Sequence, residues 1–144
     1  NEFIQNKDYV VFAVDLDNQN DSLHPETKLF PPHNITGTNG RLLYGNLHSL
    51  YTSNVKNPNI YWIDKTRYSA FAGTDLEIKL RERGITEIHI VGVASHICCL
   101  HTLVDGYNKG FDLVVHKNAV ASFNLDSHKF ALEHFENVLG AKVV

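Results

Sequence analysis

Short apolar runs alternate with segments of helical periodicity along most of the chain, and this alternation restricts the fold more than any other feature. Between the runs, apolar residues recur every three or four positions, the spacing of an amphipathic helix. The runs expected to form strands are residues 9–14, 60–63, 88–91, 111–115 and 142–144. A chain that alternates strand and helix predicts an α/β fold with a mainly parallel sheet, and the run at 9–14 is expected to be buried on both faces.

Helices are expected in the segments between the strands. The first eight residues read as the tail of a helix, and residues 18–40 read as a long loop rich in Asn, Pro, Gly and Thr. Long ordered loops are usually functional. The other helices are expected at residues 41–51, 74–83, 95–108 and 125–139, the last with Phe130, Ala131, His134, Phe135 and Val138 on one face.

Composition limits the class of protein. The 144 residues are 43% hydrophobic and 20% charged, typical of one globular domain. A net charge of −3 does not favour nucleic acid or an anionic membrane as a partner. The two cysteines are adjacent and unsuited to pairing with each other, which fits a reducing, cytoplasmic environment. The chain contains no Met and begins at Asn1, so we expect it to be part of a longer gene product, unless only an initiator Met has been removed.

Cys98 falls where the strand at 88–91 gives way to a helix. The N-terminus of a helix presents N–H groups without partners and a partial positive charge, which favour thiolate over thiol and can hold an oxyanion. The alternative is that Cys98 and Cys99 are small core residues, as free cysteines often are.

Other reactive side chains also follow expected strands. Asp15 and Asp17 end the first strand, Lys65 ends the second and Cys98 ends the third. In parallel sheets ligands bind at the carboxyl ends of the strands. The pattern therefore predicts these side chains along one edge of the sheet.

Four motifs occur in a fixed order: Phe30-Pro31-Pro32-His33, residues 37–40, residues 65–76, and residues 94–98 followed by Thr102. Together they resemble the isochorismatase-like cysteine hydrolases, in particular their nicotinamidase branch. The resemblance spans residues 9–144. It implies a three-layer α/β/α, Rossmann-like fold and hydrolysis of a carbon–nitrogen bond in a small amide, most closely nicotinamide to nicotinate and ammonia, a reaction of NAD metabolism.

The resemblance also implies catalytic roles. Cys98 takes the position of the nucleophile that forms a thioester, and Lys65 that of the lysine whose charge stabilises the thiolate. The backbone N–H groups of Ala94 and Cys98 match the oxyanion hole, and the peptide bond before Ala94 is expected to be cis. Phe30 and Tyr68 match residues that contact the ring of the substrate.

A divalent metal ion is implied by the same resemblance. Its ligand positions fall on Asp15, Asp17, Glu26 and His33, and zinc, manganese, magnesium and iron are the candidate ions. Asp17 stands where the family has His, and an oxygen-rich set of ligands favours Mn²⁺, Mg²⁺ or Ca²⁺ relative to Zn²⁺. The alternatives are a solvated strand end for Asp15 and Asp17, and an ordinary loop histidine for His33.

One expected part is missing. Family chains open with a strand that ends in Asp-x-Gln, whose Asp is the general base. Residues 9–15 match the second strand of the family, and the spacing from Asp17 to Phe30 is too short for Asp17 to be that base. We therefore expect residues 1–144 to form a single hydrolase domain that is N-terminally incomplete and lacks the central strand. His96 and Cys99 also depart from the family pattern, where Asp and an aliphatic residue are usual.

Three functions remain open at this point. The first is a cysteine amidohydrolase, and the second is a degraded, non-catalytic relative that binds a small ligand. The third is an isochorismatase-type hydrolase, which uses the fold without a catalytic cysteine. The expected partners are a small amide and further copies of the chain, with no nucleic acid and no membrane.

Overall fold

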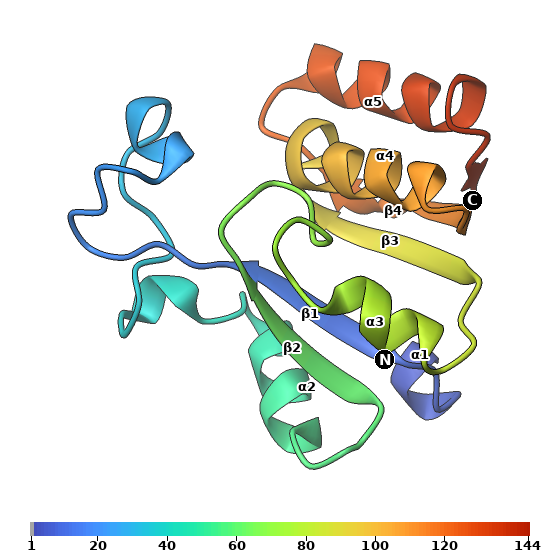
Figure 1. Ribbon diagram of the computed structural model, residues 1–144, viewed down its shortest axis with the longest axis horizontal. Coiled ribbons are helices and arrows are strands. Elements are labelled where there is room, and N and C mark those ends of the chain that lie inside the picture. The colour runs from blue at the N-terminus through green and yellow to red at the C-terminus, as the bar shows by residue number, and fades with distance from the viewer. Residues whose placement is uncertain (1) are drawn as a thin grey trace. The chain divides into compact units, whose positions relative to one another are not determined.

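The computed structural model describes residues 2–144, which fold into two compact units, Asn1–Thr66 (unit 1) and Arg67–Val144 (unit 2). Figure 1 allows the chain to be followed through both units. Each unit is described by itself. Among the described residues, no helix has both the length and the apolar character needed to cross a bilayer.

Unit 1 is built on two parallel strands. β1 (Val10–Asp15) pairs with β2 (Ile60–Lys65) in continuous register, so that Val10 lies opposite Ile60 and Asp15 lies opposite Lys65. The short helix α1 (Glu2–Gln5) precedes β1, and α2 (Asn46–Asn54) lies between the strands in sequence. This register brings the carboxyl ends of β1 and β2 together.

The long loop of unit 1 is closed at its base. Asp17 forms a parallel bridge with Ile35, in which its N–H donates to the Asn34 carbonyl and its carbonyl accepts from the Thr36 N–H. The Thr36 hydroxyl adds a hydrogen bond of 3.1 Å to the same carbonyl. Closure holds residues 18–33 beside the end of β1. Two 3₁₀ turns, η1 (Pro25–Lys28) and η2 (Asn39–Arg41), lie in and after the loop.

Unit 2 contains three parallel strands in the order β3–β4–β5. The strands are β3 (Glu87–Val93), β4 (Asp112–Ala121) and β5 (Lys142–Val143). The helices are α3 (Leu76–Arg81), a π-helical turn η3 (Ser95–Cys99), α4 (Leu100–Asn108) and α5 (Leu125–Asn137). Figure 1 shows α4 and α5 running side by side in this unit. Every strand pairing among residues 2–144 is parallel, which confirms the predicted fold class.

The core of unit 2 joins its helices to its sheet. Leu103 of α4, Val115 of β4 and Phe135 of α5 have no exposed surface. Gly106 lets α4 approach the sheet closely, since a Cβ there would lie 2.9 Å from Ile88 Cδ1. Burial of this kind contributes about 1.5–3 kcal/mol for each large apolar side chain. The segment that carries Cys98 therefore leads into α4, which is packed against the buried core of unit 2.

Several sequence expectations were wrong in detail. No residue of β1 is fully buried, although burial on both faces was predicted. The second helix begins at Asn46 rather than residue 41, because Gly45 takes a positive φ of 55° that interrupts the helix. β4 continues to Ala121 instead of ending at 115. Phe130 and Val138 of α5 are 58% and 59% exposed, so only part of the proposed apolar face of α5 is buried.

Four strands are paired on one side only. Within residues 2–144, β1 and β2 pair only with each other, and β3 and β5 each pair with β4 alone. Val91 and Val93 of β3 are 54% and 72% exposed. The single-domain organisation stays a prediction.

Candidate functional site

Cys98 lies on a tight turn between β3 and α4. The chain leaves β3 through Gly92, whose φ of 121° is open to glycine and strained for other residues, and through a cis peptide bond between Val93 and Ala94. The cis bond confirms the expectation from the resemblance. The turn itself is the π-helical segment η3, and the Ala94 carbonyl accepts from the N–H groups of Ile97 (3.1 Å) and Cys99 (3.2 Å). Cys98 is partly exposed whereas Cys99 is 5% exposed.

Three imidazoles hold this turn. His101 Nδ1 lies 2.8 Å from the Ile97 carbonyl and must be the donor, because a carbonyl oxygen only accepts. His128 Nδ1 lies 2.9 Å from Ser95 Oγ, and His96 Nδ1 lies 2.7 Å from Ser122 Oγ. The turn is therefore fixed by side chains from α4, α5 and the end of β4.

Tyr68 borders a surface hollow in unit 2. Its ring is tilted by 54° against that of His101 with 5.2 Å between centroids. The hollow has a volume of about 340 Å³ and also touches Arg67, Ala72 and Asp105. Segment 69–71 is tied to α4 through the Ala70 N–H, which donates to Thr102 Oγ1 at 3.0 Å. The motif residues 65–76 and Thr102 are thus linked in space as well as in the sequence pattern.

Lys65 and Asp15 form an ion pair at the carboxyl ends of β2 and β1. Lys65 is only 3% exposed, so its charge is compensated inside the protein. Arg41 donates from Nε to the Asp15 carbonyl at 3.2 Å and pairs with Asp64 at 2.5 Å. The structure therefore brings together two of the predicted site residues, a catalytic lysine and a metal ligand, in direct contact.

The other three predicted metal ligands gather with an additional histidine in what we call the carboxylate–imidazole cluster: Asp17, His24, Glu26 and His33. His24 Nε2 lies 3.1 Å from Asp17 Oδ1, and His33 Nε2 lies 3.4 Å from Glu26 Oε2. His33 Nδ1 is 3.7 Å from Asp17 Oδ2. Asp17, His24 and Glu26 are buried. The closed loop thus gathers two carboxylates and two imidazoles.

Hydrogen bonds set the tautomers of the two imidazoles. His33 Nδ1 donates to the Pro31 carbonyl at 3.0 Å, which leaves the lone pair on Nε2, the nitrogen that faces Glu26. His24 Nδ1 accepts from the Glu26 N–H at 3.3 Å, so a neutral His24 carries its proton on Nε2. That buried Nε2 lies at ion-pair distance from Asp17 without hydrogen-bond geometry. His33 Nε2 therefore has a lone pair that could bind a cation, and the protonated Nε2 of a neutral His24 lies near Asp17 Oδ1.

The charges of the cluster repel one another. Burial raises the pKa of Glu26, and the carboxylates of Asp15 and Asp17 raise it further, against an opposing effect of His33 and His24. A cation would relieve this repulsion, and the donor set fits a divalent metal ion in its chemistry. Within residues 2–144, no three such side chains are already arranged around one point as metal ligands.

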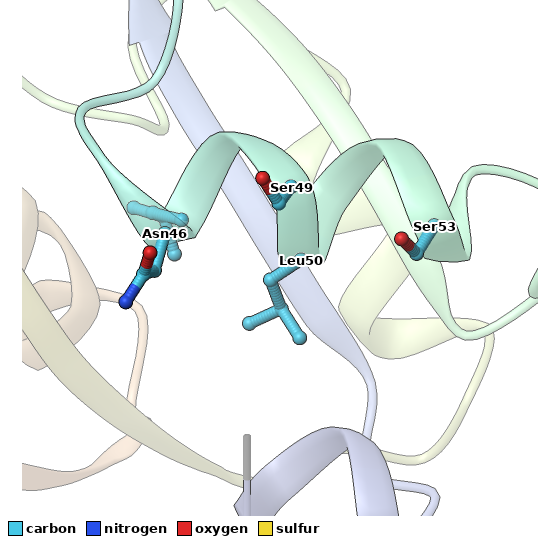
Figure 2. Close-up of a pocket in the computed structure, with 5 residues that line it drawn as sticks. Asn46, Ser49, Leu50 and Ser53 are labelled. Atoms are coloured by element: carbon cyan, nitrogen blue, oxygen red, sulfur yellow. The ribbon is translucent and has the colours of Figure 1, made fainter.

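Another surface hollow lies in unit 1. It has a volume of about 570 Å³ and runs along one face of α2. Figure 2 shows Asn46, Ser49, Leu50 and Ser53 lining it. None of the predicted site residues borders this hollow, so it carries no part of the functional argument.

Sequence reasoning missed His24 and the partners of the Cys98 turn. His24 precedes Pro25 and caps η1, and a His-Pro-Glu sequence in a polar loop was a usable signal. His128 and Ser122 had no such signal, because they lie 33 and 26 residues from their partners Ser95 and His96. Phe30 lies near the cluster, with its ring edge-on to His33 at 6.3 Å.

The parallel strands, with a cysteine on the turn after β3 and charged side chains at the ends of β1 and β2, define a protein of the Rossmann-like α/β class whose reactive side chains follow its strands. The chain belongs to the isochorismatase family, since the model of the Isochorismatase domain matches residues 1–144.

Relatives and solved structures agree with this family. An uncharacterized isochorismatase family protein PncA of Bacillus subtilis is 63% identical over 142 residues, which cover 99% of this chain and 78% of the relative. The crystal structure of nicotinamidase/pyrazinamidase PncA from the same species superposes with a TM-score of 0.98 at 59% identity, over 99% of this chain and 78% of that one. The pyrazinamidase/nicotinamidase of Streptococcus mutans gives a TM-score of 0.97 at 48% identity, over 99% and 79%.

Proposed function

We propose that the protein is a cysteine amidohydrolase that converts nicotinamide to nicotinate and ammonia. The observation that carries the proposal is the placement of Cys98 on a turn fixed between β3 and α4, in a chain 59% identical to a solved nicotinamidase/pyrazinamidase. Backbone N–H groups at the start of a helix favour the thiolate and can hold an oxyanion. Ala94 and Cys98 would supply these N–H groups.

The reaction has two balanced steps. The Cys98 thiolate attacks the amide carbonyl carbon, the carbon–nitrogen bond breaks, and nitrogen leaves as ammonia after it gains a proton. Water then attacks the thioester, the carbon–sulfur bond breaks, and nicotinate and the thiolate are formed. Two protons are released in this second step, and one restores the group that protonated the nitrogen. Lys65 would stabilise the thiolate, and its ion pair with Asp15 orients its ammonium group.

The substrate would be bound by aromatic rings and by the carboxylate–imidazole cluster. Phe30 and Tyr68 would contact the pyridine ring. Asp15, Asp17, Glu26 and His33 would hold a divalent cation, which when bound would supply a Lewis-acidic contact for the pyridine nitrogen. Two buried carboxylates and one imidazole with its lone pair directed into the cluster support this part of the proposal. Such an oxygen-rich set of ligands favours Mn²⁺, Mg²⁺ or Ca²⁺ relative to Zn²⁺.

The cellular setting forms a lesser part of the proposal. Neither Cys98 nor Cys99 forms a disulfide, which is consistent with a reducing cytoplasm.

We also propose a homo-oligomer, because Phe123, Leu125 and Phe130, in and just before α5, are more than half exposed.

Ammonia release from nicotinamide tests the function. We expect Cys98→Ala to lower the rate by at least about a thousandfold, because the covalent route is lost. Cys99→Ala is the matched control, since it removes the neighbouring thiol and should retain most of the activity. Full ammonia release by Cys98→Ala would overturn the proposal.

A further inference from the structure

Two hydrogen bonds, each between a serine hydroxyl and an imidazole, connect the turn that carries Cys98 to the start of α5. In one, the hydroxyl is on the turn and the imidazole on the helix: Ser95 Oγ lies 2.9 Å from His128 Nδ1. In the other, the imidazole is on the turn and the hydroxyl lies before the helix: His96 Nδ1 lies 2.7 Å from Ser122 Oγ. Ser95 and His96, three and two positions before Cys98, are therefore each held by a hydrogen bond, and we call these two bonds the clamps.

The Ser95 end of its bond is buried. Ser95 has no exposed surface, whereas its partner His128 is partly exposed. A buried polar group that loses its partner costs about 1–3 kcal/mol. The hydrogen bond between Ser95 and His128 therefore disfavours any position of the turn in which the two side chains are separated.

The His96 bond ends on a fixed point. Ser122 Oγ also accepts from the Asn124 N–H at 3.3 Å, and Asn124 Oδ1 caps α5 by accepting from the Ser127 N–H at 2.9 Å. The His96 ring packs edge-on against Phe123, with centroids 5.1 Å apart. His96 is thus connected through Ser122 to the N-cap of a thirteen-residue helix.

We propose that His96 and Ser95, held by Ser122 and His128, are positioning residues that keep the backbone around Cys98 in the geometry that stabilises its thiolate. The inference rests on the proposed role of Cys98 as the nucleophile. A preorganised set of N–H groups lowers the energy of the anion only if those groups stay in place, because their reorientation would cost free energy each time the thiolate forms. The His96 side chain, which departs from the family pattern, thereby gains a role.

The test uses pairs of variants that differ in one hydrogen bond. His96→Asn keeps a polar atom near the position of Nδ1, whereas His96→Phe keeps a ring of similar shape and loses the bond. His128→Asn and His128→Leu make the same comparison from the α5 side. Ser127→Ala is the matched control, because it removes a hydroxyl one residue from His128 that takes no part in either clamp.

The readout is the rate of Cys98 alkylation by iodoacetamide as a function of pH, with the modified cysteine identified by peptide mass spectrometry. The midpoint of the profile reports thiolate stability, and the plateau reports access to the sulfur, so the two effects separate. The imidazoles of His96, His101 and His128 are the titratable side chains that hold the turn. Each Asn variant removes one of these imidazoles while it keeps a polar atom in place for the bond.

We expect His96→Phe and His128→Leu to move the midpoint up by at least about half a pH unit, roughly a threefold loss of thiolate at neutral pH. His96→Asn, His128→Asn and Ser127→Ala should stay near the parent value. Unchanged midpoints in both His96→Phe and His128→Leu would overturn the inference, whatever happens to the plateau. If His128→Leu fails to fold, Ser95→Ala removes the same bond with a smaller change. Alkylation does not require turnover. If the unsubstituted protein released no ammonia from nicotinamide, the proposed function would be rejected, but the alkylation midpoints would still test the role of the two hydrogen bonds.

Discussion

Asp15 and Lys65 face each other across two adjacent parallel strands and pair their charges at the carboxyl end of the β1–β2 sheet. The ammonium group is almost completely buried and the carboxylate is 23% exposed. Because the pair is fixed by strand register, the position of one side chain sets that of the other. The ion pair therefore connects Lys65, which is proposed to stabilise the thiolate, with Asp15, which is one of the proposed ligands of the cation.

Loss of Asp15 should therefore destabilise the protein strongly. Asp15→Asn breaks the ion pair of the buried Lys65 ammonium by removing one of its two charges, a change that costs about 3–5 kcal/mol in buried pairs. The control is Asp64→Asn on the neighbouring position, where the Arg41–Asp64 pair is more exposed and contributes about 1 kcal/mol or less. Urea unfolding of the two variants should show a clearly larger loss for Asp15→Asn. Equal losses would mean that the Lys65–Asp15 pair has no special role.

Asp64 should also contribute to stability in a pH-dependent way. Partial burial acts to raise the pKa of Asp64, but hydrogen bonds from Arg41 and Trp62 outweigh it, and the pKa lies below its usual value of 3.8. A lowered carboxyl pKa contributes stability that is complete above pH 3.8 and is lost as pH falls through the lower, folded-state pKa. Unfolding free energies between pH 2 and 6, compared with those of Asp64→Asn, should converge at the acid end. A constant difference over this range would contradict the expectation.

A divalent cation should bind through the carboxylate–imidazole cluster. We expect His33→Ala and Asp17→Ala to lower the metal content of protein equilibrated with Mn²⁺ and then desalted, because each removes a proposed ligand. His48→Ala, a histidine of α2 outside the cluster, is the control and should leave the content unchanged. Elemental analysis measures the metal content. Equal metal content in all three variants would show that the cluster does not hold the cation.

The one-sided strands predict the behaviour of residues 1–144 expressed alone. β1, β2, β3 and β5 each leave one row of backbone groups without a strand neighbour among the described residues, and such edges promote association with other chains. We expect the isolated segment to associate or to unfold without cooperativity. Size-exclusion chromatography and denaturation test this, and a cooperative, fully active monomer would refute it.

Local pattern was sufficient for most of the fold. The strands β1, β2 and β3 and the helix after Cys98 lie within a few residues of their expected positions, because continuous apolar runs and helical spacing are strong local signals. The start of α2 was misplaced because the apolar spacing of residues 41–50 continues through Gly45, and only the backbone shows that Gly45 breaks the helix. The exposed Phe130 and Val138 satisfied a helical pattern, but burial depends on what packs against α5.

The site was only partly predictable for a similar reason. Residue types at strand ends pointed to Asp15, Lys65 and Cys98, since parallel strands place their carboxyl ends together. That Lys65 pairs with Asp15 depends on strand register, which a single sequence does not determine. The contacts of His96 and His128 join segments more than 25 residues apart, and no local pattern connects them.

The most direct test of the account is the search for the covalent intermediate on Cys98. The protein would be mixed with nicotinamide, quenched with acid within one turnover, digested and analysed by mass spectrometry. The account predicts a nicotinoyl thioester on the peptide that carries Cys98, absent from Cys98→Ala and present in Cys99→Ala. Ammonia release at the normal rate with no acyl group on Cys98 at any quench time would contradict it.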